Sequence, residues 1–288
     1  MVASAPDRGA AGPAPTGDAV TIGGLAGGGP ERHERTVTVN GHPCRVWEKG
    51  HGDPVGYLAG PFGLSRWTPF LDALAEHRRV VVPSLPGYPG GGTGHSDLDD
   101  LADWVSATLD LLDGSELDGA DLIGVSVGAT LAAEAAAFSP HSVRRLVLVA
   151  PFGLHVAEDP VPNFFAANPK QMPALVCADR SRSEAQLARP EDVDEVEWSV
   201  VCGRAIAAGA RLLWPMCDTR LVRRLHRITA PTLVVWGEED AVIGPAYAKR
   251  FAAGIAGPTE TVVVPGAGHH ADWDRPAELA ERVLAFLR

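Results

Sequence analysis

One serine in the chain stands in a setting that could make it a nucleophile. Residues 124–128 read Gly-Val-Ser-Val-Gly, a G-x-S-x-G motif with Ser126 at its centre. A serine so placed has to sit on a tight turn between a strand and a helix, and the flanking glycines give the backbone room. An apolar run precedes the serine and a run of small residues follows it. The motif predicts a nucleophile elbow; the alternative is a serine that caps an ordinary helix.

A serine hydroxyl becomes a useful nucleophile only when a nearby base takes its proton. The best candidate base is His269, which ends the glycine-rich segment Pro-Gly-Ala-Gly-His at residues 265–269. This segment follows the last predicted strand, so the side chain could reach the top of a sheet. The adjacent His270 is the competing candidate.

The base in turn needs a carboxylate that fixes its tautomer and stabilises the imidazolium. Asp240 follows a predicted strand in the segment Trp-Gly-Glu-Glu-Asp and is followed by an apolar turn, whereas Glu238 and Glu239 have the pattern of solvated loop acids. The chain order serine, aspartate, histidine differs from the orders in chymotrypsin and subtilisin and is that of α/β-hydrolases. We therefore expect Ser126, His269 and Asp240 to form a catalytic triad.

The elements that must position these side chains follow from hydrophobic patterning. Asn40-Gly41 is a strong hairpin signal, and Ser96 with Asp99 has the form of a capping box for a helix from Asp97 to about Leu112. An initial hairpin followed by alternating strands and helices predicts an α/β fold with a mostly parallel, doubly wound sheet. The predicted strands are 35–39, 44–48, 55–59, 79–83, 121–125, 145–150, 232–236 and 261–264, and the predicted helices are 67–77, 97–112, 127–138, 246–253 and 276–287.

The alternation stops in the middle of the chain, between about Phe152 and Arg224. Several prolines and a helical stretch near residues 192–208 replace it, and strand-like units resume at Thr232. We expect a helical insertion that covers the carboxyl edge of the sheet. The predicted organisation is a disordered leader at 1–30, a core at 31–153 and 223–288, and a helical cap at 154–222.

Bulk properties exclude several classes of protein. The formal net charge of −11 over 288 residues argues against a nucleic-acid partner. No run approaches the ~20 apolar residues of a membrane span, and the first thirty residues lack the apolar core of a secretory signal, so we expect no membrane association and a cytoplasmic location. The four cysteines form no paired motif. We expect no metal, no cofactor, a small-molecule substrate, and a monomer or homodimer.

On these residues the chain resembles the α/β-hydrolase superfamily, over nearly everything after Glu31. The matching segments are 58–63, 82–88, the elbow, 230–240 and 265–269. The resemblance implies that Ser126, Asp240 and His269 occupy the triad positions, that the reaction passes through an acyl-enzyme, and that the insertion is a cap that selects the substrate. A serine at the elbow excludes haloalkane dehalogenases and epoxide hydrolases, which place aspartate there.

The loop at residues 59–62 departs from that family. Its usual His-Gly pair is Ala-Gly here, and the next residue is Pro61, which has no N–H to donate. The resemblance implies an oxyanion hole made by the N–H of Val127 and one N–H of this loop. If the register holds, the loop donor moves to Phe62. Removing such a donor can raise a barrier by roughly 2.7–4 kcal/mol.

Aromatic residues could line an apolar substrate pocket beneath the cap, although aromatics more often serve the core. The candidates are Trp67, Tyr88, Trp198 and Trp214, with Phe62 beside them. The expected activity is hydrolysis of an ester, thioester or lactone-type carbonyl of a small, largely apolar substrate. The alternatives are hydrolysis of a carbon–carbon bond, as in meta-cleavage-product hydrolases, a non-hydrolytic cyclase or lyase that uses the same triad, and a non-catalytic ligand-binding protein.

Overall fold

The computed structural model describes residues 31–162, 164–168, 171–214 and 217–288. The predicted leader at 1–30 lies outside the described residues. Within them, eight strands form one sheet in the order β1-β2-β4-β3-β5-β6-β7-β8. The strands are β1 His33–Val39, β2 His42–Lys49, β3 Pro54–Leu58, β4 Arg79–Pro83, β5 Ala120–Val125, β6 Val143–Val149, β7 Thr232–Gly237 and β8 Thr259–Val264.

The sheet has an antiparallel start and a parallel remainder. β1 and β2 form a hairpin whose turn residues, Asn40 and Gly41, both have positive φ (50° and 78°), as a two-residue turn of this kind requires. β2 also pairs antiparallel with β4, and every later neighbour pair in the sheet is parallel. The predicted mostly parallel, doubly wound sheet is confirmed.

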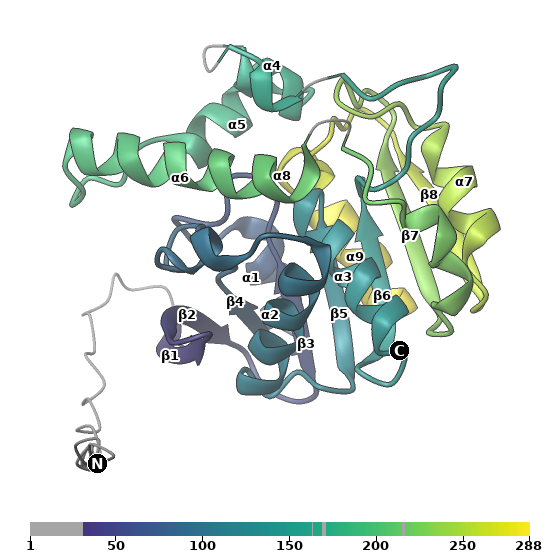
Figure 1. Ribbon diagram of the computed structural model, residues 1–288, viewed down its shortest axis with the longest axis horizontal. Coiled ribbons are helices and arrows are strands. Elements are labelled where there is room, and N and C mark those ends of the chain that lie inside the picture. The colour runs from purple at the N-terminus through teal and green to yellow at the C-terminus, as the bar shows by residue number, and fades with distance from the viewer. Residues whose placement is uncertain (1–30, 163, 169–170, 215–216) are drawn as a thin grey trace, which may run out of the picture.

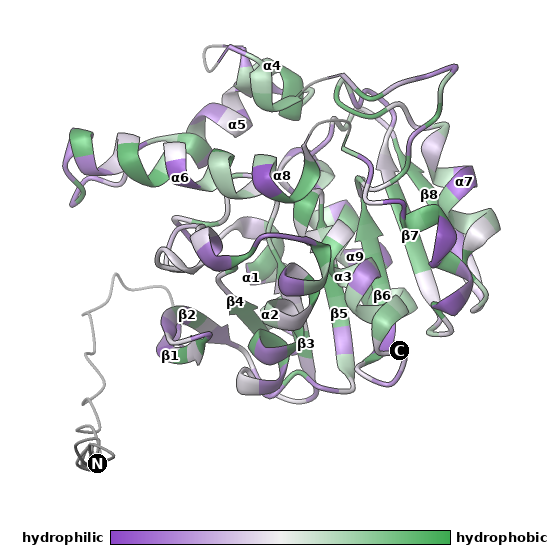
Figure 2. Ribbon diagram, in the orientation of Figure 1, coloured by the Kyte–Doolittle hydropathy of each residue, from purple (hydrophilic) through white to green (hydrophobic). Residues whose placement is uncertain are grey.

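Helices cover both faces of the sheet, and alternate strand residues supply two separate cores. On β5, Leu122 belongs to one apolar cluster, whereas Ile123 and Val125 belong to the other. The first cluster includes α2 (Leu101–Gly114), α3 (Val127–Phe138) and α7 (Tyr247–Gly254), and the second includes α1 (Pro69–Ala75) and α9 (Pro276–Phe286). Figure 2 shows β6 and β7 mostly in the hydrophobic colour, as expected for strands buried on both sides. The helices also include α8 Ala271–Asp274.

Between β6 and β7 the chain is helical and lies beyond the carboxyl ends of the strands (Figure 1). The helices of this segment are α4 Met172–Val176, α5 Arg180–Leu187 and α6 Glu195–Leu213, with short 3-10 turns at η2 Phe164–Ala166, η3 Leu221–Arg223 and η4 Leu225–Arg227. The division into core and cap at 154 and 222 stays a prediction. None of the described helices is long and apolar enough to cross a membrane.

The capping box proposed for the second long helix is wrong by four residues. Ser96 lies in the 3-10 turn η1 Gly94–Asp97, and α2 begins only at Leu101. Asp100 has an extended backbone, and its Oδ1 accepts the N–H groups of Ala102 and Asp103. The Asp103 carboxylate accepts the N–H of Asp100 in return. Asp100 and Asp103 thus form the capping box that was expected of Ser96 and Asp99.

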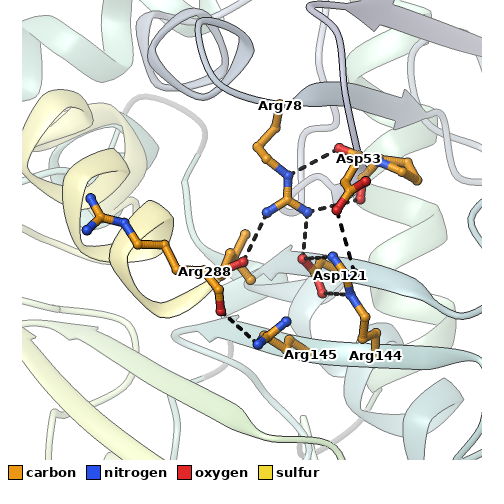
Figure 3. A network of polar contacts seen from close by, with 8 residues as sticks. Asp53, Arg78, Asp121, Arg144, Arg145 and Arg288 are labelled. Carbon is orange, nitrogen blue, oxygen red and sulfur yellow. Dashed lines mark hydrogen bonds and ion pairs between the residues drawn. The ribbon is translucent and has the colours of Figure 1, made fainter.

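An ion-pair network lies at the amino ends of the parallel strands, the end of the sheet opposite to the helical segment between β6 and β7 (Figure 3). The buried Asp121 of β5 accepts Arg78 Nη2 at 2.6 Å and the Nε and Nη2 of Arg144 at 2.8 Å each. Arg145 Nη2 donates to the main-chain oxygen of Arg288 at 2.7 Å. These contacts join β5 and β6 to the residue before β4 and to the C-terminal residue, which stabilises the end of the sheet remote from the candidate nucleophile.

Candidate active site

Ser126 occupies a strained turn between β5 and α3. Its backbone has φ 55° and ψ −117°, a conformation that non-glycine residues rarely adopt. Both motif glycines are sterically required, because a Cβ at Gly124 would lie 2.5 Å from the Cα of Ala129 and one at Gly128 would lie 2.2 Å from the carbonyl oxygen of Leu58. The turn therefore holds the hydroxyl at the carboxyl edge of the sheet.

The imidazole of His269 lies against this hydroxyl. Its Nε2 is 2.8 Å from Ser126 Oγ, and its Nδ1 is 2.9 Å from Asp240 Oδ2. All three side chains are buried. When Asp240 Oδ2 accepts a hydrogen bond from Nδ1–H, the lone pair of Nε2 is directed at the serine. The three predicted triad members thus form one continuous hydrogen-bonded chain across segments 143 and 29 residues apart in sequence.

Asp240 is fixed by the turn that follows β7. Its Oδ1 accepts the N–H of Val242 at 2.8 Å and of Ile243 at 2.9 Å, so only Oδ2 faces the histidine. Glu238 and Glu239 are exposed. The apolar turn that follows Asp240 in the sequence supplies the backbone donors that orient the carboxylate.

His270 makes a different set of contacts. Its ring stacks on Trp273 at a centroid distance of 3.8 Å, and its Nδ1 lies 3.1 Å from Asp272 Oδ1. Asp272 Oδ2 accepts the hydroxyl of Tyr57 at 2.8 Å. Burial and the neighbouring Asp272 carboxylate raise the pKa of Tyr57 well above its usual value, so the phenol keeps its proton. His269, and not His270, therefore contacts Ser126. His270 belongs to a second polar cluster, with Asp272 and Tyr57.

The expected oxyanion donors are main-chain N–H groups of the elbow and of the loop after β3. Val127 is the first residue of α3, so its N–H has no partner within the helix. In the loop after β3, Gly63 N–H donates to the carbonyl of Gly60 at 3.0 Å, and Pro61 has no N–H. Phe62 is the loop residue left to donate, and the roles of Val127 and Phe62 stay predictions.

A cavity of about 520 Å³ lies between the loop after β3 and the helices α4–α6. Phe62 and Trp198 line it, as do several residues that the sequence did not single out. Among the described lining residues, Arg66 alone carries a charge. The other apolar side chains of the wall include Phe165, Leu187, Ile206 and Trp273.

Three of the predicted pocket aromatics do not line this cavity, because their side chains pack or point elsewhere. Trp67 packs on Trp47 with ring centroids 6.5 Å apart, and Tyr88 is buried in the core under α6. Trp214, at the end of α6, is 62% exposed. At about 100° per residue, its position on α6 is rotated by about 160° from that of Trp198, so both cannot face one cavity.

Aromatic rings separate this cavity from the triad. The rings of Phe152 and Phe164 lie 5.5 Å and 6.4 Å from the His269 ring, and Phe164 also contacts Phe62 at 6.2 Å. Neither Ser126 nor His269 lines the cavity among the described residues, and both have no exposed surface. Access from the cavity to the hydroxyl therefore requires some of the surrounding side chains to move.

No sequence pattern indicated a role for Asp274, which connects the histidine loop to the helical segment between β6 and β7. This buried carboxylate accepts the N–H of Gly268 at 2.7 Å, of Ala178 at 2.8 Å and of Asp179 at 3.1 Å. The N–H of His270 donates to the carbonyl of Val176 at 2.7 Å. The loop that carries His269 and the turn between α4 and α5 are thus held together by the Asp274 carboxylate and by one main-chain hydrogen bond.

No metal cluster accompanies these residues within the part of the chain that the structure describes: no group of three or more His, Cys, Asp or Glu side chains is arranged to hold an ion. The four cysteines are free thiols. Burial raises the pKa of Cys44 and of Cys217 to about 11 each, which keeps both as thiols at neutral pH. The reactive groups that the structure brings together are therefore a hydroxyl, imidazoles and carboxylates.

Sequence comparison identifies the family to which this site belongs. The profile of the Alpha/beta hydrolase family matches residues 39–282. Because that match covers most of the chain, the protein belongs to the α/β-hydrolase family and is a hydrolase.

Two curated relatives are similar over different lengths. The dihydrolipoyllysine-residue acetyltransferase component of the acetoin cleaving system of Pseudomonas putida is 33% identical over 269 residues, which are 87% of this chain and 68% of that protein. The 2-hydroxy-6-oxo-2,4-heptadienoate hydrolase of Pseudomonas putida is 33% identical over 124 residues, which are 42% of this chain and 45% of that one. The matched region thus spans about two thirds of the first relative and less than half of the second.

Solved structures share the fold at low sequence identity. A meta-cleavage product hydrolase from Pseudomonas fluorescens has a TM-score of 0.73 and 18% identity, covering 88% of this chain and 96% of that one. The naproxen esterase of Bacillus subtilis has a TM-score of 0.69 and 17% identity, covering 90% of this chain and 92% of that one. At such identities the likeness establishes the architecture alone.

Proposed function

We propose that the protein hydrolyses an ester, thioester or lactone-type carbonyl of a small, largely apolar substrate through an acyl-enzyme on Ser126. The observation that carries this proposal is the hydrogen-bonded chain from Ser126 Oγ through His269 to Asp240, with distances of 2.8 and 2.9 Å. Such a chain lets a hydroxyl lose its proton as it attacks.

The first half of the reaction forms the acyl-enzyme. Ser126 Oγ attacks the carbonyl carbon while His269 Nε2 takes the hydroxyl proton, and Asp240 stabilises the resulting imidazolium. The carbonyl oxygen becomes an oxyanion beside the N–H of Val127 at the positive end of α3. Collapse of this intermediate expels the leaving group, which receives its proton from His269.

The second half repeats the chemistry with water. His269 Nε2 takes a proton from a water molecule as its oxygen attacks the acyl carbon. The second tetrahedral intermediate breaks the bond to Ser126 Oγ, which regains the proton from His269, and the carboxylic acid leaves. Every proton taken by the imidazole is returned within the same half-reaction, so no cofactor is needed.

The cavity supports an apolar substrate. Its walls are aromatic and aliphatic for the most part, and a volume of about 520 Å³ is within the range of small-molecule sites. Because the Phe164 ring lies between Phe62 and His269, we infer that its displacement joins the cavity to the nucleophile.

Labelling with a fluorophosphonate probe tests the nucleophile. The wild-type protein should be labelled, and Ser126→Ala should not be. Ser142→Ala, a change at another buried serine, serves as the matched control and should be labelled normally. Labelling of Ser126→Ala at an undiminished rate would remove Ser126 from the mechanism.

A second candidate function, hydrolysis of a carbon–carbon bond, is favoured by the names of the relatives. A heptadienoate hydrolase and a meta-cleavage product hydrolase are among them. Turnover of p-nitrophenyl esters should be compared with that of a vinylogous diketone acid. Fast ester turnover with none of the diketone supports our proposal, and the reverse supports the second candidate. Because one relative is named an acetyltransferase, products should also be analysed for acyl groups on added alcohols or thiols.

A further inference from the structure

A second imidazole, that of His270, lies beside the elbow with one nitrogen unused. Its Nδ1 is bound to Asp272, but its Nε2 has no hydrogen-bond partner among the described residues, although the side chain is 1% exposed. An unpaired polar atom in the interior costs stability, and proteins keep few of them. A nitrogen left open at this place is therefore a candidate for contact with a ligand.

Gly60 shows where this nitrogen lies. A Cβ at that glycine would be 2.7 Å from His270 Nε2, 2.5 Å from its Cε1 and 3.5 Å from the Cβ of Ser126. The edge of the imidazole and the nucleophile thus converge on one point of the loop after β3. Any side chain at residue 60 would collide with the ring, so the glycine keeps the two groups adjacent.

One position of the same loop has no hydrogen-bond donor. The residue after Gly60 is Pro61, which has no N–H, and the N–H of Gly63 is already donated to the carbonyl of Gly60. An oxyanion formed on Ser126 would therefore meet fewer backbone donors on this side than a loop without proline would give it.

The ring is held in place from three sides. Trp273 stacks on one face at 3.8 Å and an interplanar angle of 16°, and Asp272 binds Nδ1. Tyr57 donates its hydroxyl to the other oxygen of Asp272 at 2.8 Å. The His269 ring is perpendicular to it at 5.9 Å. An imidazole that carries a proton on each nitrogen can donate from Nδ1 to Asp272 and from Nε2 to a ligand at the same time.

We propose that His270 Nε2–H donates a hydrogen bond to the carbonyl oxygen of the substrate as it becomes an oxyanion, in place of the amide that Pro61 cannot supply. Asp272 and Tyr57 are positioning residues for this donor. The inference rests on the acyl-transfer function proposed for Ser126 and adds a catalytic residue to it.

The test compares His270→Phe with His270→Gln, using p-nitrophenyl butyrate as the substrate. Phenylalanine keeps the stacking on Trp273 but has no donor, so kcat should fall about 10²–10³-fold with KM changed only a few-fold. Glutamine can place an N–H near the former Nε2 and should recover at least about tenfold of that loss. His141→Phe, a change at an exposed histidine of the surface, is the control and should match the wild type.

A trifluoromethyl ketone distinguishes a donor from a purely structural side chain, because it forms a tetrahedral oxyanion on the serine. Its inhibition constant should rise in His270→Phe by about the factor by which kcat/KM falls. An unchanged inhibition constant, or unchanged kcat, would overturn the proposal for His270. If His270→Phe does not fold, Asp272→Asn takes its place and should weaken the ketone in the same way. Turnover by Ser126→Ala would instead overturn the acyl-enzyme itself.

Discussion

The two ends of the parallel sheet treat their polar groups in opposite ways. At the amino end, buried Asp121 receives three hydrogen bonds from Arg78 and Arg144. Burial alone would raise the pKa of Asp121, but the hydrogen bonds and charges of the two arginines outweigh it and hold that pKa below its usual value. At the carboxyl end, Ser126 has a strained backbone, and His270 has a buried nitrogen without a partner.

The polar groups at the amino end stabilise the fold, whereas those at the carboxyl end have hydrogen-bonding capacity left for a ligand. Fully satisfied, charge-assisted pairs hold strands together, whereas strain and unmet hydrogen-bonding capacity concentrate at functional sites. We therefore expect substitutions at the amino end to change stability with little effect on the chemical step. Substitutions at the carboxyl end should do the reverse.

The largest effect is expected from Asp240→Asn. The asparagine oxygen can still accept the N–H groups of Val242 and Ile243, but its amide cannot accept the Nδ1 proton of His269, so the wrong tautomer is favoured. We predict a fall in kcat of about 10⁴-fold with p-nitrophenyl butyrate, and a melting temperature close to that of the wild type. Glu239→Gln, in the exposed part of the same loop, is the control. A fall in kcat of less than tenfold would contradict the role of Asp240 in orienting His269.

Asp121→Asn should act on stability. It removes the buried counter-charge of Arg78 and Arg144, although Arg144 keeps Asp53 Oδ2 at 3.7 Å. Breaking such a pair costs roughly 3–5 kcal/mol when it is fully buried. We expect the lower part of that range, because Arg144 is 43% exposed and can be hydrated. Urea unfolding measures the loss, and kcat at 25 °C should stay within a few-fold of the wild type.

The pH dependence of this loss has a defined sign. Because the folded-state pKa of Asp121 is lowered, its contribution to stability is present above the unfolded-state pKa of about 3.9 and is lost as the pH falls through the folded-state pKa. The difference in unfolding free energy between wild type and Asp121→Asn should therefore be largest near neutral pH and shrink below about pH 4. A difference that grows on acidification would show that Asp121 is not stabilised as its anion.

The smallest effect is expected at the aromatic barrier. Phe164→Leu shortens the ring between the cavity and His269, so a bulky fluorophosphonate should label the variant several-fold faster than the wild type. Phe138→Leu, a change at a half-exposed ring on α3, should leave the rate unchanged. Equal rates in all three proteins would mean that the substrate reaches Ser126 by another route.

Much of the core could be predicted from the sequence, because short local runs of residues determine its strands and helices. The bounds of β4 and α3 are those expected. A continuous apolar run predicts only a strand at β4, and an Ala-rich segment predicts only a helix at α3. The three side chains Ser126, Asp240 and His269 follow strands whose carboxyl ends share one edge. Chain order and strand ends were therefore sufficient to bring them together.

The remainder depends on contacts that no local pattern contains. Tyr57 meets Asp272 across 215 residues, and Asp274 accepts N–H groups from the distant turn at Ala178. The short helices α4 and α5 have no long apolar repeat and were not predicted. The direction of Trp214 depends on where α6 begins and ends, and two or three residues of error turn a side chain from cavity to solvent.

Detection of a covalent intermediate tests the central claim most directly. A reaction with p-nitrophenyl butyrate, quenched in acid before turnover is complete, should contain protein whose mass has increased by one butyryl group. Fragmentation of the peptide that contains residues 124–128 should assign the group to Ser126, and the same treatment of Ser126→Ala should give no adduct. Turnover with an adduct on another residue, or undiminished turnover by Ser126→Ala, would contradict the mechanism.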